Sequence, residues 1–79
     1  MSHNVAAEVM SVEILIDLAT STLSAAHGLK DMLLAYQAQR PSYDSSTGLP
    51  PSLSDLSNAR MKVREAAGLM LDLAADPGV

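Results

Sequence analysis

Residues 40–51 read RPSYDSSTGLPP, and this stretch is the clearest boundary in the chain. Its prolines fix the backbone dihedral φ and lack an amide hydrogen, while its serines, Asp44 and Gly48 favour turns over regular structure. A helix therefore ends before this stretch, and a second one begins after it. We predict a linker over about 40–52.

The sequence on each side of the linker favours a helix. Residues 5–39 and 53–75 are rich in Ala, Leu, Val, Ile and Met, and neither range contains a proline. One continuous first helix is expected, because a single helix glycine costs only about 1 kcal/mol relative to alanine; a break at Gly28 is the alternative. We predict one all-α domain, 1–79, in which a long helix, a Pro/Ser-rich linker and a shorter helix form an antiparallel hairpin.

Ser52 is expected to begin the second helix. Its hydroxyl can accept a backbone N–H there, and Asp55, three residues later, adds negative charge to the first turn. Ser54 is the competing cap. The far end carries the usual stop signals, which are Asp76, Pro77 and Gly78.

The second helix has the pattern of an ordinary amphipathic helix. Its apolar seam consists of Leu56, Ala59, Val63, Ala66, Met70 and Leu73. Charged and amide side chains are spread over the opposite side.

The first helix is apolar over a wider surface. Its sustained polar stripe consists of Glu13, Asp17, Thr20, Ser24, His27 and Asp31. One apolar seam, the first seam, consists of Val5, Val9, Val12, Ile16, Ala19, Leu23 and Ala26. The other, the second seam, consists of Leu15, Leu18, Ala25, Leu29, Met32 and Tyr36. A helix with two apolar seams needs more than one neighbour.

The two predicted helices differ in length. At about 1.5 Å per residue, the first is roughly 52 Å long and the second roughly 35 Å. If the linker folds them back antiparallel, Ala75 lies near the level of Asp17, and residues 5–16 (VAAEVMSVEILI) extend beyond the second helix. This overhang would expose an apolar patch of the kind that marks an interaction site.

The same alignment sets small residues against small residues. Residues 24–26 (Ser, Ala, Ala) come level with residues 66–68 (Ala, Ala, Gly). One interpretation is that the two backbones approach closely, which would give Gly68 a packing reason to lie inside a helix. The other is that alanine is a good helix former and the match is compositional.

A chain of 79 residues buries only about 60% of the surface that it exposes when unfolded. It has no cysteine for a disulfide and two histidines for a metal, so association is the expected source of added stability. We predict a homodimer in which two hairpins form an antiparallel four-helix bundle. The alternative is that the overhang docks in a groove on a different protein.

The residues expected at this contact lie toward the N-terminal end of the first helix. They are Val5, Val9, Val12, Leu15, Ile16 and Leu23. A second candidate surface is the basic cluster Arg60, Lys62 and Arg64, which could guide an acidic partner onto the second helix. Because a spacing of two distributes these side chains around a helix, separate solvation of each is the alternative. The linker is interpreted as a flexible connection, with recognition through Tyr43 as the alternative.

The sequence contains no pattern that indicates catalysis or metal binding. Glu13 and Asp17 are interpreted as part of a solvated stripe, because di-metal helical bundles use a Glu-x-x-His spacing that is absent here. His27 and Asp31 are interpreted as a surface hydrogen-bonded pair and not as a metal site or proton relay. Hydroxyls such as that of Thr20 lack the base and orienting group that a nucleophile needs. We expect no catalytic residue, no metal and no cofactor.

Charge and hydropathy argue against two classes of partner. The net charge of −4 opposes binding to a phosphate backbone, which needs a basic face. Glu8, Glu13 and Asp17 interrupt the apolar N-terminal stretch, whereas a secretory signal needs a basic leader and a membrane span needs about 20 apolar residues. We therefore expect neither nucleic acid nor membrane as partner, and a cytoplasmic location.

These observations predict a small non-enzymatic interaction module. Such a chain would act as an adaptor, antagonist or inhibitor that binds a larger protein target through an apolar helix face. By analogy, a bacterial or phage-encoded inhibitor fits this size and charge. The alternative is a structural or chaperone-like subunit of a larger assembly.

Overall fold

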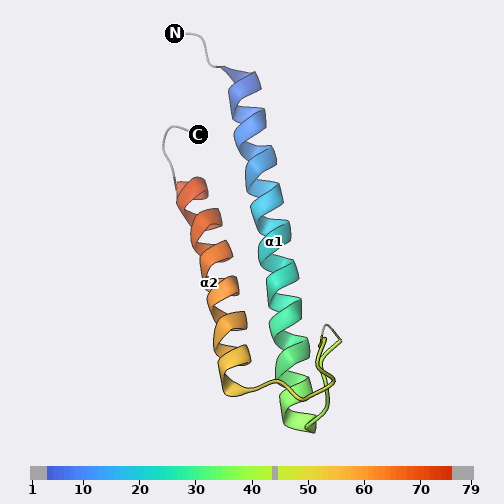
Figure 1. The fold of residues 1–79 in the computed structure, drawn as a ribbon. Helices are drawn as coiled ribbons and strands as arrows, with labels where there is room; N and C mark the ends of the chain where they lie inside the picture. The colour runs from blue at the N-terminus through green and yellow to red at the C-terminus, as the bar shows by residue number, and fades with distance from the viewer. Residues whose placement is uncertain (1–3, 44, 76–79) are drawn as a thin grey trace.

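A computed structural model describes residues 4–43 and 45–75 and shows two antiparallel helices joined by a loop (Figure 1). Helix α1 spans Val5–Ala38, and helix α2 spans Leu53–Ala75. The molecule is elongated and measures 60 × 16 × 16 Å. The predicted all-α hairpin is confirmed, and α1 extends past the described end of α2 in Figure 1.

Helix α1 is continuous from its first turn to its last. The Asn4 side chain accepts the N–H of Ala7 (3.1 Å), which satisfies one of the backbone donors left free at a helix start. Sequence reasoning missed this cap, although an asparagine before an apolar helix is a recognised start signal. The helix passes through Gly28 without a break.

The C-terminal end of α1 closes on a residue in the left-handed conformation. Gln39 has a φ of 54°, and its N–H donates to the carbonyl of Tyr36 (3.2 Å). The N–H of Arg40 donates to the carbonyl of Ala35 (3.0 Å), which completes a Schellman-type end. Glycine is the usual residue at such a position, so the glutamine gave no signal in the sequence.

Helix α2 begins with a reciprocal pair of hydrogen bonds. The Ser52 hydroxyl accepts the N–H of Asp55 (3.2 Å), and the Asp55 carboxylate accepts the N–H of Ser52 (2.8 Å). This is the geometry of a capping box, with Asp in the place that Glu or Gln usually takes. The predicted cap at Ser52 is confirmed over Ser54, and the predicted stop signals at 76–78 lie outside the described residues.

The linker is held against α1. Figure 1 shows that it turns back along the last turns of α1 before it crosses to α2. The backbone N–H of Tyr43 donates to the Asp31 carboxylate (3.1 Å), and Gly48 supplies the positive φ of 71° that its turn requires. Pro51, at the end of the linker, is buried. In its described part the linker contacts α1 through this hydrogen bond, while most of its residues are exposed, so the interpretation as a flexible connection stays a prediction.

The seam of α2 packs against the second seam of α1. Every residue of the α2 seam is buried or half-buried, from Leu56 at 2% exposed to Leu73. All six residues of the second seam are likewise buried from solvent in part, and Ala35, beside them, is fully buried. Thr22 lies on the same face, and its hydroxyl donates to the Leu18 carbonyl (2.8 Å). The second seam is thus the intramolecular interface.

This interface forms a thin core. Among the described residues, the buried ones are Ala35, Pro51, Leu56 and Ala59. Two helices can cover only one side of each other, so most of the larger side chains between them, Leu56 excepted, stay half-buried. A core of this size leaves a small domain weakly stabilised unless it associates.

Gly68 has no packing role in the hairpin. A Cβ atom placed on Gly68 would meet no neighbouring atom within 4 Å, and the same holds for Gly28. The interpretation that glycine permits close backbone approach here is therefore wrong. The alanines of this region remain as good helix formers, half-buried along the α2 face.

Candidate interaction surface

The first seam lies on the surface along its whole length. Its seven residues are all exposed, and its larger side chains are uncovered by 43% to 61%, at Val12 and Val5 respectively. At 100° per residue, this seam lies roughly 120° around α1 from the second seam. Helix α2 therefore cannot cover both. The first seam forms an apolar stripe several turns long without a neighbour among the described residues.

Five of the six residues predicted at a self-association contact are on this exposed stripe. They are Val5, Val9, Val12, Ile16 and Leu23. The sixth, Leu15, is half-buried and belongs to the seam that faces α2. Residue 15 lies in the predicted overhang by position, but its angle around the helix turns it toward α2, and its part in an outer contact stays a prediction.

The N-terminal end of this stripe borders an open depression of about 490 Å³. It is lined by Val5, Val9, Val12 and Ile16, with Glu8 and Glu13 at its edges. An apolar floor between carboxylates suits an apolar side chain from a partner helix better than a charged ligand.

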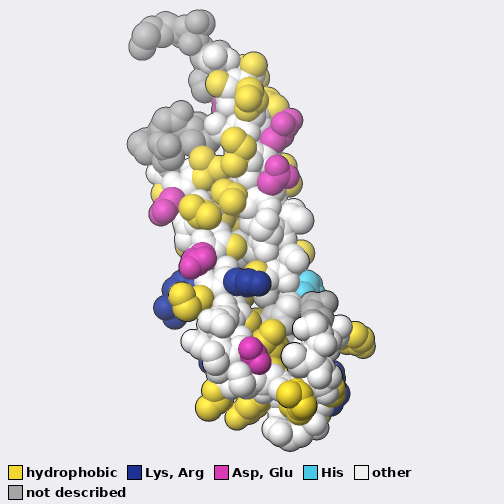
Figure 2. All heavy atoms as spheres, viewed as in Figure 1, with side chains coloured by type: hydrophobic (Ala, Val, Ile, Leu, Met, Phe, Trp, Pro, Cys, Tyr) yellow, Lys and Arg dark blue, Asp and Glu magenta, His cyan; other side chains and the backbone are white. Residues whose placement is uncertain are grey.

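The exposed apolar surface extends beyond the first seam. Met10 and Ile14 are 64% and 52% exposed on another side of α1, and Leu69 and Leu71 of α2 are 59% and 62% exposed. Figure 2 shows hydrophobic side chains gathered over the N-terminal half of α1 and the neighbouring end of α2. Leu69 and Leu71 lie outside the heptad seam of α2, so the sequence pattern could have predicted their exposure.

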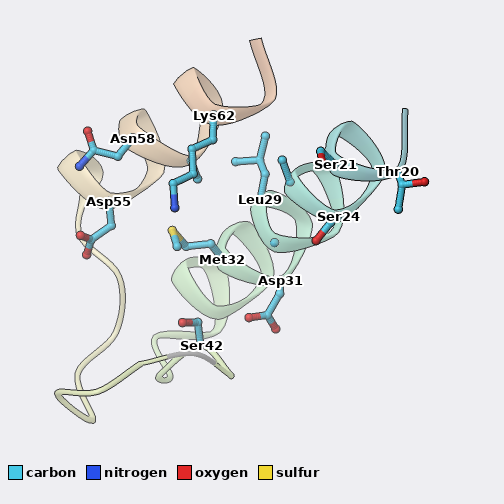
Figure 3. Close-up of a pocket in the computed structure, with 13 residues that line it drawn as sticks. Thr20, Ser21, Ser24, Leu29, Asp31, Met32, Ser42, Asp55, Asn58 and Lys62 are labelled. Atoms are coloured by element: carbon cyan, nitrogen blue, oxygen red, sulfur yellow. The ribbon is translucent and has the colours of Figure 1, made fainter. Parts of the chain in front are cut away.

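A groove of about 640 Å³ lies between the helices near the linker (Figure 3). Its α1 wall carries Ser21, Ser24 and Gly28, and its α2 wall carries Asn58 and Lys62. In Figure 3 the Lys62 side chain reaches over the groove toward Met32, whereas Asp55 and Asn58 turn away. The groove presents few converging polar groups, so its geometry does not define a ligand site.

The predicted basic cluster does not form a single patch. Arg60, Lys62 and Arg64 are all exposed, but only Lys62 of the three lines the groove. A spacing of two places Lys62 more than about 150° around α2 from either arginine, while Arg60 and Arg64 share one side. A partner could meet the two arginines together, but not all three cations at once.

The structure changes one of the predicted polar pairs. Asp31 accepts the backbone N–H of Tyr43, and in the described part of the chain no hydrogen bond joins it to His27. The predicted His27–Asp31 hydrogen bond is therefore not formed, while one oxygen of the Asp31 carboxylate accepts the linker N–H. The Thr20 hydroxyl donates to the Ile16 carbonyl (2.9 Å), as helix hydroxyls often do. In residues 4–43 and 45–75, no three Asp, Glu or His side chains gather as a metal site would require.

By length and composition, α1 also meets the criterion for a membrane span. Its most apolar 18-residue window has a mean hydropathy of 1.4, and none of that window is buried in the hairpin. The core helix of a soluble protein, which is mostly buried, and a signal sequence near the N-terminus pass the same criterion, so the finding does not assign a location. The same values show that α1 is strongly apolar and that its most apolar window is not buried by the rest of the hairpin.

No protein-family model matches the sequence, and no curated protein or solved structure matches it.

Proposed function

We propose that this chain is a non-enzymatic interaction module of the cytoplasm that docks the first seam of α1 against a helix of another polypeptide, its own copy included. The observation that carries the proposal is the exposure of that whole seam on a hairpin whose own core is thin. An apolar stripe of this length is costly to leave in water and is the usual mark of a protein interface.

The first partner in this proposal is a second hairpin. Two copies that bury their first seams together would bring four helices into one dimer. The dimer would then present its remaining exposed surfaces to a larger protein target, as an adaptor, antagonist or inhibitor does. The pair Arg60 and Arg64 is the charged surface available for an acidic region of that target.

The second candidate function is a structural or chaperone-like subunit of a larger assembly. It is favoured by the apolar side chains off the first seam, such as Met10, Ile14 and Leu71, because several exposed faces call for several neighbours. A self-complementary contact closes at two copies, whereas a head-to-tail contact continues to grow.

The solution mass of the purified chain separates these functions. Light scattering over a tenfold concentration range should give a constant mass of two chains if the first seam pairs with itself. Growth of the mass with concentration would favour the assembly subunit. A folded monomer would rule out self-pairing. In that case, the immobilised chain should bind a helix of another protein from solution through the first seam. The matched control is an immobilised Val12→Asp/Ile16→Asp chain, which should retain none.

A further inference from the structure

The first seam has the spacing that a second helix requires. Its seven residues, from Val5 to Ala26, follow one another at alternating intervals of four and three residues. This is a heptad repeat that continues for three heptads. Knobs-into-holes packing needs this average of 3.5 residues, whereas a lipid surface or a globular pocket does not. The occupant that the spacing fits is a helix with the same repeat.

A lipid surface is a poor occupant on charge. The sequence has no Lys or Arg before Lys30, and Glu8, Glu13 and Asp17 lie along the apolar part of α1. Interfacial helices that bind lipid carry cations beside their apolar face, because the headgroup layer is commonly anionic. The carboxylates of α1 would be repelled from such a surface.

The small residues of the seam lie in its C-terminal part, on either side of Leu23, and that placement favours an antiparallel partner. Its N-terminal part holds Val5, Val9 and Val12, and its C-terminal part includes two alanines, Ala19 and Ala26. A parallel copy would set alanine against alanine and leave a gap at those layers. In the heptad repeat, Val9 and Ile16 are a positions, and Val12 and Ala19 are d positions. In an antiparallel copy a positions meet d positions, so Val12 lies across from Ile16 of the second copy and Val9 across from its Ala19.

We infer that the first seam is occupied by the first seam of a second copy, antiparallel and centred near residue 14. This inference rests on the proposed function. In this dimer the two α1 helices overlap in the middle, and the two α2 helices lie toward opposite ends, because each α2 runs alongside α1 away from its N-terminus (Figure 1). The assembly is a long rod and not a bundle with all four helices side by side.

The test is a distance between labels on the two copies. The chain has no cysteine, so His27→Cys and Glu13→Cys each provide one site for a nitroxide, on exposed positions of α1. In the antiparallel dimer, His27 lies 13 residues from the centre in each copy, which separates its labels by about 40 Å along the axis. Glu13 lies at the centre, so its labels stay within about 20 Å in either orientation.

Pulsed electron paramagnetic resonance on the labelled full chain, with the mass checked by light scattering, gives the two distances. A short distance at Glu13 with a distance of about 40 Å at His27 supports the inference. Short distances at both sites would overturn the antiparallel arrangement and leave self-pairing in place. A monomer without a dipolar signal at either site would overturn the second copy as occupant, while the proposed docking of a foreign helix would stand.

Vesicles provide the remaining outcome. Phosphatidylcholine vesicles, sedimented with the chain at the same concentration, should leave the chain in solution and the Glu13 distance unchanged. Sedimentation of the chain with loss of that distance would overturn the inference in favour of a lipid surface.

Discussion

The two apolar seams of α1 have opposite surroundings. The second seam packs on α2, whereas the first seam, on the same helix, is exposed from Val5 to Ala26. Apolar character does not decide which seam is covered, because the exposed first seam is rich in Val and Ile, whereas the covered second seam includes Tyr36. The difference shows that burial in a hairpin is decided by where one neighbouring helix lies, and that a two-helix fold leaves whatever it cannot reach for another molecule.

The largest expected effect comes from charging the exposed seam. Val12→Asp together with Ile16→Asp should raise the dissociation constant of the dimer by at least about 100-fold, because each carboxylate would be buried without a partner. Light scattering and circular dichroism measure mass and helicity together. Thr20→Asp with Ser24→Asp, on the polar stripe, adds the same charge and should leave the dimer intact. Loss of helical signal in the first variant would show instead that this seam belongs to the obligate core.

A smaller effect is expected from truncation of the α2 seam. Leu56→Ala should lower the free energy of unfolding by about 3 kcal/mol, because Leu56 is 2% exposed and its loss leaves a cavity. Leu23→Ala removes the same atoms from a side chain that is 60% exposed. In the monomeric Val12→Asp/Ile16→Asp background, it should change that free energy by less than about 0.5 kcal/mol. Equal losses in urea titrations would erase the distinction between the two seams.

The start of α2 gives the next prediction, because it sets which residues of α2 meet the second seam. Ser52→Ala should cost about 1 kcal/mol of unfolding free energy, since it removes the acceptor of the Asp55 N–H. Ser54→Ala, two residues later, should stay within about 0.5 kcal/mol. Thermal unfolding of both variants measures the difference, and a larger loss at Ser54 would move the cap there.

The smallest expected effect is a gain in stability. Gly68→Ala should raise the free energy of unfolding by about 0.5 to 1 kcal/mol, because the alanine removes backbone freedom from the unfolded chain and meets no atom within 4 Å. Urea titration measures it, with Gly28→Ala as the parallel case on α1. Destabilisation by Gly68→Ala would restore the close approach of the helices that the structure rejects.

Much of the candidate surface was predictable, and the errors have a common origin. Five of the six predicted contact residues are exposed, but Leu15 is not, since its angle around α1 turns it toward α2. His27 was paired with Asp31 by local spacing, although a linker residue far along the chain takes that carboxylate. Gly68 was given a packing role because it comes level with residues 24–26 along the hairpin. That position along the axis says nothing about the distance between the two helices.

The sequence by itself determined the two helices, the linker between them, the cap at Ser52 and the existence of two seams on α1, because each follows from interactions within a few residues. Only the tertiary structure decided which seam α2 covers, where Asp31 finds its partner and how close the helices come. Helical periodicity gives the angles between residues around one helix, but not the direction in which each residue faces in the folded molecule. The path of the linker and the packing of α2 determine which side of α1 is covered, and both depend on residues far apart in the chain.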